Sequence, residues 1–177
     1  SVETNLRVQR GDPNLAVDFS EGHLFFVLGP ATGASCSNGW LPEHAYAAWR
    51  AQGVVDEACL PYAGSATNPS TLCADWANRV TKITGSENLT GNPARMKEWI
   101  STKGAIVGCF EVFEDFFSYR SGVYTHVTGA SVGGHCISIV GYNDAGGYWI
   151  CKNSWTDGWG DRGFFNIAYG QSRPFSG

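Results

Sequence analysis

The sequence has little charge and no long apolar run. Asp, Glu, Lys and Arg make up 16% of its 177 residues, against about 25% in typical globular chains, and the net charge is −4. Without an excess of basic residues, binding to nucleic-acid phosphates is not expected. Its apolar runs fall far short of the roughly 20 residues that span a bilayer. The sequence therefore predicts neither a nucleic-acid partner nor a membrane partner.

Metal-ligand spacing is missing too. No Cys-x-x-Cys pair occurs, and the Cys and His positions do not have the spacing of a zinc site. Hydrophobic residues make up 43% of the chain and aromatic residues 14%, which excludes intrinsic disorder. The chain also contains 23 glycines, a share well above the usual one of about 7%. We expect a turn-rich fold of one domain or two small lobes.

Helix signals and strand signals lie in different parts of the chain. Pro42 and Gly53 bracket one helical segment, and a hairpin signal over 143–147 joins two apolar runs. We expect helices over 1–10, 21–28, 42–52 and 92–102, a loop over 59–73, and strands over 105–113, 135–142, 148–152 and 163–168. This order predicts an α+β fold of two lobes, an α-rich one over 1–78 and a β-rich one over 79–177.

Two segments carry the clearest chemical signal. Residues 133–142 read Gly-Gly-His-Cys-Ile-Ser-Ile-Val-Gly-Tyr, and residues 152–160 read Lys-Asn-Ser-Trp-Thr-Asp-Gly-Trp-Gly. Their order and separation resemble the histidine and asparagine blocks of papain-like cysteine peptidases. Three earlier segments are also similar to the family: 20–24, 36–40 and 56–62, the last as it occurs in cathepsin C.

The resemblance implies a fold and a reaction. The fold would be papain-like, an α-rich lobe followed by an antiparallel β-barrel-like lobe, with the site in the cleft between them. The substrate would be a peptide or protein, cleaved through an acyl-thioester without a metal or an organic cofactor. His135 would be the general base and acid, and Asn153 would orient it. Trp155 and Trp159 would cover the Asn–His hydrogen bond.

The same resemblance implies a substrate-binding surface. Backbone groups of Asn38, Gly39 and Gly134 would lie along the substrate strand. Side chains of Trp40, Leu41 and Cys136 would form an apolar second subsite. Trp159 would also flank the primed subsites.

One family block is absent. The Gln-x-x-x-Cys-Gly-x-Cys-Trp pattern, which supplies the nucleophile and an oxyanion donor, does not occur. We expect the chain to be N-terminally incomplete, to lack half of the nucleophile helix, and to be inactive alone. In the family the partner of Cys36 lies in that block, so Cys36 would be unpaired and could link an N-terminal peptide or chain.

The other cysteines lead to further expectations. Cys59 and Cys73 would form a local bridge, while Cys109, Cys136 and Cys151 would be buried free thiols. Together with the family, the bridge pattern predicts a secreted protein or one of a lysosome- or vacuole-like compartment.

Alternatives to this interpretation remain open. The chain could be a non-catalytic peptide-binding or inhibitory module that keeps the cleft without the chemistry. Cys36 could itself be a nucleophile, although it lies only 99 residues before His135, and Ser1 could act as an N-terminal nucleophile. The remaining histidines and a glycosylation sequon have no catalytic support; the histidines are expected on the surface or on helix faces (His23, His44, His126; sequon 88–90).

Overall fold

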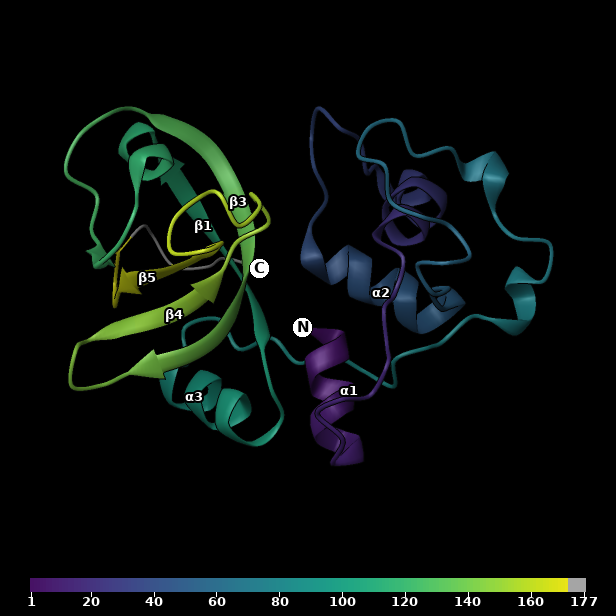
Figure 1. Ribbon diagram of the computed structural model, residues 1–177, viewed down its shortest axis with the longest axis horizontal. Coiled ribbons are helices and arrows are strands. Elements are labelled where there is room, and N and C mark those ends of the chain that lie inside the picture. The colour runs from purple at the N-terminus through teal and green to yellow at the C-terminus, as the bar shows by residue number, and fades with distance from the viewer. Residues whose placement is uncertain (172–177) are drawn as a thin grey trace. The chain divides into compact units, whose positions relative to one another are not determined.

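The chain forms two compact units in the computed structural model, which describes residues 1–171 (Figure 1). One unit combines Ser1–Asn14 with the chain from Leu89 onward, and the other is Leu15–Asn88. The helices within the described residues do not have the length and apolar character that crossing a bilayer requires.

The first unit is built on a five-stranded sheet with the order β1-β3-β4-β5-β2. Neighbouring strands are antiparallel, except that the short β2 runs parallel to β5. The sequence predicted an antiparallel lobe and missed β2, because two residues show no periodicity. The strands are β1 (Ile106–Phe113), β2 (Val123–Tyr124), β3 (Ser131–Asn143), β4 (Tyr148–Lys152) and β5 (Phe164–Ala168).

An aromatic cluster fills the core of this sheet unit. Side chains of β1 alternate strictly between buried and half-buried positions, so one face of the strand meets the core. Phe116, in the 3-10 helix η5 (Glu114–Ser118), is fully buried. Its ring contacts the rings of Phe110, Tyr119, Tyr124, Trp155, Trp159 and Phe165.

Helix α1 (Val2–Arg10) belongs to the sheet unit, together with α3 (Pro93–Thr102). Asn5 explains this grouping. Its Nδ2 donates to the carbonyl of Ala105 at 2.7 Å, and its Oδ1 accepts from Trp99 Nε1 at 2.8 Å. The structural units therefore differ from the lobes expected at 1–78 and 79–177, because polar contacts remote in sequence join the first helix to the second half of the chain.

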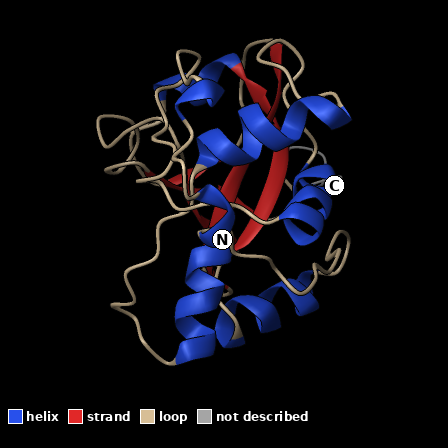
Figure 2. Cartoon of the chain, turned by 90° about the vertical axis from the view of Figure 1, so that its right-hand side faces the viewer, coloured by secondary structure: helices blue, strands red, loops and turns tan. Residues whose placement is uncertain are grey.

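The second unit consists of short helices joined by long loops (Figure 2). The predicted helix over 21–28 contains a π-helix, and Ser20 Oγ accepts from the backbone N–H of His23 at 2.9 Å. Val55, Cys59 and Leu60 form a small buried core. The helical segments are η1 (His23–Leu28), η2 (Gly29–Thr32), α2 (Pro42–Gln52), η3 (Pro69–Thr71) and η4 (Trp76–Asn78).

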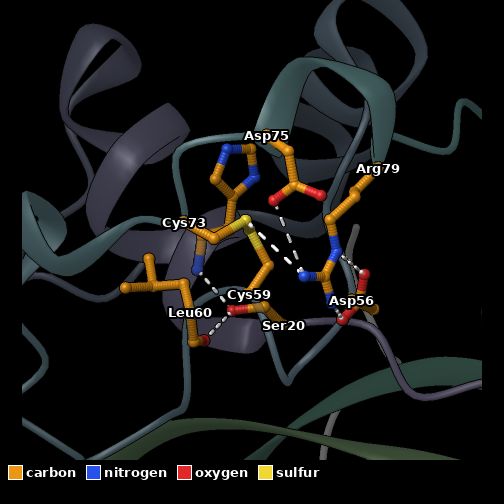
Figure 3. The surroundings of a disulfide bond; sticks show 8 residues. Ser20, Asp56, Cys59, Leu60, Cys73, Asp75 and Arg79 are labelled. Atoms are coloured by element: carbon orange, nitrogen blue, oxygen red, sulfur yellow. Dashed lines mark hydrogen bonds and ion pairs between the residues drawn. A yellow bond between two sulfur atoms is a disulfide. The ribbon is translucent and has the colours of Figure 1, made fainter.

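A disulfide joins Cys59 to Cys73 in this unit, the two residues for which a local bridge was predicted (Figure 3). The loop that it closes is also held by Arg79, whose Nε donates to Asp56 Oδ2 at 2.8 Å. The same guanidinium keeps the pKa of the Asp56 carboxyl below its usual value. Covalent and ionic links therefore fix a segment that has little regular structure of its own.

A second disulfide, Cys109–Cys136, corrects the expectation of free thiols at these positions. The two cysteines face each other directly on β1 and β3. The sequence did not reveal this because 27 residues separate them and only the strand register brings them together. Cys151 is fully buried and free as expected, and burial raises the pKa of its thiol.

His23 was expected on the surface or on a helix face; it lies in the helix η1, but on its buried side. Its side chain is 2% exposed, and within the described residues its Nδ1 has no hydrogen-bond partner. Ser20 and Leu28 are buried as well, so the side of the helix that carries His23 faces the interior of the unit. Burial lowers the pKa of His23 because the charged form would lose its hydration.

The lowered pKa predicts that the unit Leu15–Asn88 loses stability in mild acid. Above pH 6.5 His23 is neutral in both the folded and the unfolded chain, so the unit keeps the full stability that the neutral imidazole allows. As the pH falls below 6.5, only the unfolded chain takes up the proton, so stability falls by up to about 1.4 kcal/mol per pH unit until the lowered folded pKa is reached. Hydrogen exchange at Val54 and Val55, corrected for intrinsic rates, measures this slope.

His23→Leu should flatten that slope, with His44→Leu as the control, because His44 is exposed on α2. An unchanged difference between pH 7.5 and pH 5.5 in the His23→Leu chain would show that another group is responsible.

Candidate active site

His135 and Asn153 are brought together by the pairing of β3 with β4. Ser138 pairs with Lys152, so Asn153 comes at the position opposite Ile137 and diagonal to His135. Residues in this relation share one face of the sheet. His135 Nε2 lies 2.8 Å from Asn153 Oδ1, which is a normal hydrogen-bond distance.

The hydrogen bonds of Asn153 determine the tautomer of His135. The backbone N–H of Ser154 also donates to Asn153 Oδ1 at 2.8 Å, so this atom accepts both bonds. Nε2 of His135 must then carry a proton. In the neutral imidazole the other nitrogen, Nδ1, is left with its lone pair and can take up a proton.

Trp155 covers this pair. Its ring stacks on the His135 ring at 5.0 Å with an interplanar angle of 27°. Trp159 meets Trp155 edge-on at 5.1 Å, and its Nε1 donates to the carbonyl of Phe117 at 3.2 Å. Both tryptophans were expected to cover the Asn–His bond; the structure places Trp155 on the imidazole and Trp159 behind it.

The loop after β4 holds Asn153 in a constrained backbone. The N–H of Asn153 donates to the carbonyl of Gly163 at 2.8 Å. Thr156 has a φ of 63°, which is costly for a β-branched residue. Gly160 has a φ of 62°, and a Cβ there would lie 2.6 Å from the carbonyl oxygen of Phe164. Only glycine fits that turn.

Asn153 also carries an unsatisfied group. Its side chain is 7% exposed, and Nδ2 has no hydrogen-bond partner among the described residues. A buried donor without a partner costs about 1–3 kcal/mol. A buried side-chain amide with one unsatisfied atom is typical of a residue whose second polar atom serves a function. In Asn153 that second atom is Oδ1, which accepts from His135.

Gly134 and Cys136 flank His135 on β3, and both are exposed. Cys136 was expected to offer an apolar thiol to the substrate, but it is half of a disulfide. The exposed residue that follows His135 in the chain is therefore half of a cystine on the opposite face of the strand.

The remaining predicted substrate contacts lie in the other unit, in one turn. Ser35 O accepts from the N–H groups of Asn38 at 3.2 Å and Gly39 at 2.8 Å. Trp40 Nε1 donates to Thr32 Oγ1 at 3.0 Å, and the side chain of Leu41 is 52% exposed. The structure thus groups these four residues with one another, and His135, Asn153, Trp155 and Trp159 with one another.

Two residues of the site were missed in the sequence. Phe117 stacks on Trp155 at 5.1 Å with an angle of 9°, and Cys109 completes the disulfide beside His135. The alternation along β1 indicates the face on which Cys109 lies, but only the register of β1 against β3 brings Cys109 to Cys136. Nothing local distinguished Phe117 from its buried neighbour Phe116.

Comparisons with known proteins agree on one family. Residues 1–175 match the sequence profile described as "Papain family cysteine protease". The chain is 36% identical over 157 residues to a protein named cathepsin B from Dictyostelium discoideum, covering 75% of this chain and 50% of that protein. It is 38% identical over 149 residues to cathepsin B-like CP2 from Giardia intestinalis, covering 77% and 48%.

A solved structure gives the same result for the fold. The structure of proCathepsin B S9 from Trypanosoma congolense superposes with a TM-score of 0.75 at 26% identity, covering 96% of this chain and 60% of that one. These relatives are of the cathepsin B type, whereas the segment 56–62 was compared with cathepsin C. The chain spans about half the length of the curated relatives named here.

Proposed function

The chain belongs to the papain family of cysteine proteases, and on this premise we propose that it supplies the histidine and asparagine of a cysteine peptidase whose nucleophile lies outside these 177 residues. The observation that carries the proposal is the 2.8 Å contact between His135 Nε2 and Asn153 Oδ1 beneath Trp155. This arrangement fixes the ring and leaves Nδ1 ready to accept a proton from a thiol.

The reaction follows from that tautomer. The thiol proton of the nucleophile passes to His135 Nδ1, and the thiolate attacks the carbonyl carbon of the peptide bond. The tetrahedral intermediate collapses, the C–N bond breaks, and the imidazolium protonates the leaving amine. His135 then takes a proton from water, the resulting hydroxide attacks the acyl-thioester, and the acid product leaves as the thiol is restored.

Asn153 and Trp155 would assist without exchanging protons. Asn153 Oδ1 holds the ring orientation throughout, and it stabilises the imidazolium because Nε2 remains a donor to it. The ring of Trp155 excludes water from one face of the imidazole, which strengthens the hydrogen bond to Asn153. Gly134 is the proposed substrate contact of the sheet unit, and Asn38, Gly39, Trp40 and Leu41 are the proposed substrate contacts of the unit Leu15–Asn88.

Cys36 is the proposed attachment point for an N-terminal peptide or chain. Its thiol is free and exposed in the structure. The mass of the native protein should fall in the presence of reductant if a second polypeptide is bound there. A single 19.1 kDa species with a free Cys36 thiol would rule the linkage out.

The direct test joins a nucleophile-bearing segment of the Gln-x-x-x-Cys-Gly-x-Cys-Trp pattern to Ser1 and measures hydrolysis of a fluorogenic peptide amide. We expect turnover that requires the second Cys of that pattern, the one before Trp, and that is abolished when this Cys is replaced by Ser. A chain that folds with the segment, binds the peptide and never turns it over would support the alternative, a non-catalytic peptide-binding or inhibitory module. The retention of the His135–Asn153 pair favours the peptidase, since binding alone does not need it.

The compartment is also a proposal. Two disulfides and the family favour an oxidising environment, and a secreted or lysosome-like location fits them.

A further inference from the structure

The Cys109–Cys136 disulfide lies one residue from His135. Cys109 pairs directly with Cys136, and the next pair along the two strands is Phe110 with His135. Side chains of successive residues point to opposite faces, so the disulfide lies on the face opposite to the imidazole. No other covalent bond joins β1 and β3 within the described residues.

The start of β3 has little else to fix its register. Ser131–Gly134 are all exposed, and Gly133 has a φ of 121°. The pairing is irregular opposite this segment, because Val112 pairs with Gly133 while Phe113 pairs with Ser131. Register is weakly specified in glycine-rich strands, and a slip of one residue turns every side chain to the other face. A slip here would move His135 away from Asn153.

We propose that the Cys109–Cys136 disulfide is a redox-sensitive cross-link that fixes the register of β3 and so holds His135 against Asn153. This regulation rests on the proposed function of His135. In the oxidised form the two strands are joined beside the imidazole. In the reduced form only backbone hydrogen bonds hold the glycine-rich segment.

Exposure makes this disulfide the reducible one of the two. Cys136 is exposed and Cys109 is half-buried, whereas in the other bridge Cys73 is half-buried and Cys59 is only 2% exposed. Exposed disulfides are the labile and regulatory ones, because an attacking thiolate can reach a sulfur in line with the bond. The chain therefore contains its own internal control, the Cys59–Cys73 bridge.

The reductant would be a dithiol or two equivalents of a monothiol. One thiolate attacks Cys136 Sγ, the S–S bond breaks, and Cys109 leaves as a thiolate that takes up a proton. The second thiolate resolves the mixed disulfide and releases Cys136. The cystine gains two electrons and two protons, and the reductant becomes a disulfide. Glu111 lies on the same face as Cys109, so an uncharged dithiol is the appropriate probe.

The first measurement is a titration of the chain with dithiothreitol, followed by alkylation and peptide mass spectrometry. We expect Cys109 and Cys136 to be alkylated at a concentration at least about tenfold below that needed for Cys59 and Cys73. Equal reduction of both bridges, or earlier reduction of Cys59–Cys73, would overturn the redox-sensitive part of the proposal.

The second measurement follows the His135 imidazole by NMR of the histidine-labelled chain. In the oxidised chain the Nε2 proton should exchange slowly with solvent, and selective reduction should speed its exchange at least about tenfold because the segment opens more often. Cys109→Ala with Cys136→Ala should reproduce the fast exchange without reductant. Cys109→Val with Cys136→Val, a β-branched pair that favours pairing, should restore part of the protection.

A matched control replaces the neighbouring pair on the same face, Val107→Ala with Ser138→Ala, and should leave the His135 signals unchanged. Unchanged exchange after reduction would show that the cross-link does not position His135. A His135 ring that never shows the Nε2-protonated tautomer, even when oxidised, would instead count against the proposed function, so the two failures are distinguishable.

Discussion

Replacing His135 by Gln is expected to lower kcat about 10³- to 10⁴-fold in a peptidase that joins this chain to a nucleophile-bearing segment. Gln cannot take the thiol proton at neutral pH, and it cannot protonate the leaving amine. Both chemical steps therefore lose their proton carrier, while the substrate-binding surface keeps its shape. Initial rates of peptide-amide hydrolysis at saturating substrate measure the loss, and KM should change little.

The matched control for this variant is His44→Gln, because His44 is exposed on α2 and outside the proposed site. Its kcat should equal that of the parent. Asn153→Ala should lie between the two, since it keeps the imidazole but releases its orientation and fixed tautomer. A His135→Gln loss below tenfold would mean that another group carries the proton, and the proposed mechanism would be abandoned.

The His–Asn pair was predicted from the resemblance of residues 133–142 and 152–160 to the two family blocks, and the strands that the structure shows explain why the pair forms. The strand over 148–152 is found with those bounds, and the strand expected over 135–142 lies within β3. Once two antiparallel strands are joined by a short hairpin, their register follows, and Asn153 must come close to His135. The helix over 42–52 was equally well defined, because Pro42 and Gly53 mark both of its ends.

Other features were set by contacts remote in sequence. The Cys109–Cys136 bridge depends on the register of β1 against β3, which no local pattern encodes. The placement of α1 depends on the side chain of Asn5, whose partners lie about a hundred residues away. The burial of His23 was missed because an imidazole is equally common on the surface and in a core. Local signals predicted the elements, and tertiary contacts decided how they are joined.

Phe116→Ala is expected to destabilise the sheet unit by about 3–5 kcal/mol. The ring is fully buried, and its centroid lies 4.9 Å from those of Tyr124 and Trp159 and 5.0 Å from that of Phe165. Removing it leaves a cavity that several rigid rings cannot fill. The loss is a large part of the 5–15 kcal/mol that typically stabilises a folded chain. Urea midpoints, with hydrogen exchange at Ile139 and Ile167, measure it.

The consequence extends to the site, because Phe116 also contacts Trp155 at 5.6 Å, and Trp155 covers His135. Phe116→Leu should recover most of the lost stability, since it restores much of the volume. Phe164→Ala, at a 38% exposed position beside Phe165, should cost less than about 1 kcal/mol. If Phe116→Ala and Phe164→Ala had the same midpoint, the aromatic cluster would not be the core of this unit. Trp155, which stacks on His135, would then have to be held in place by other contacts. Trp155 can shield the imidazole only if the residues packed behind its ring keep that ring fixed.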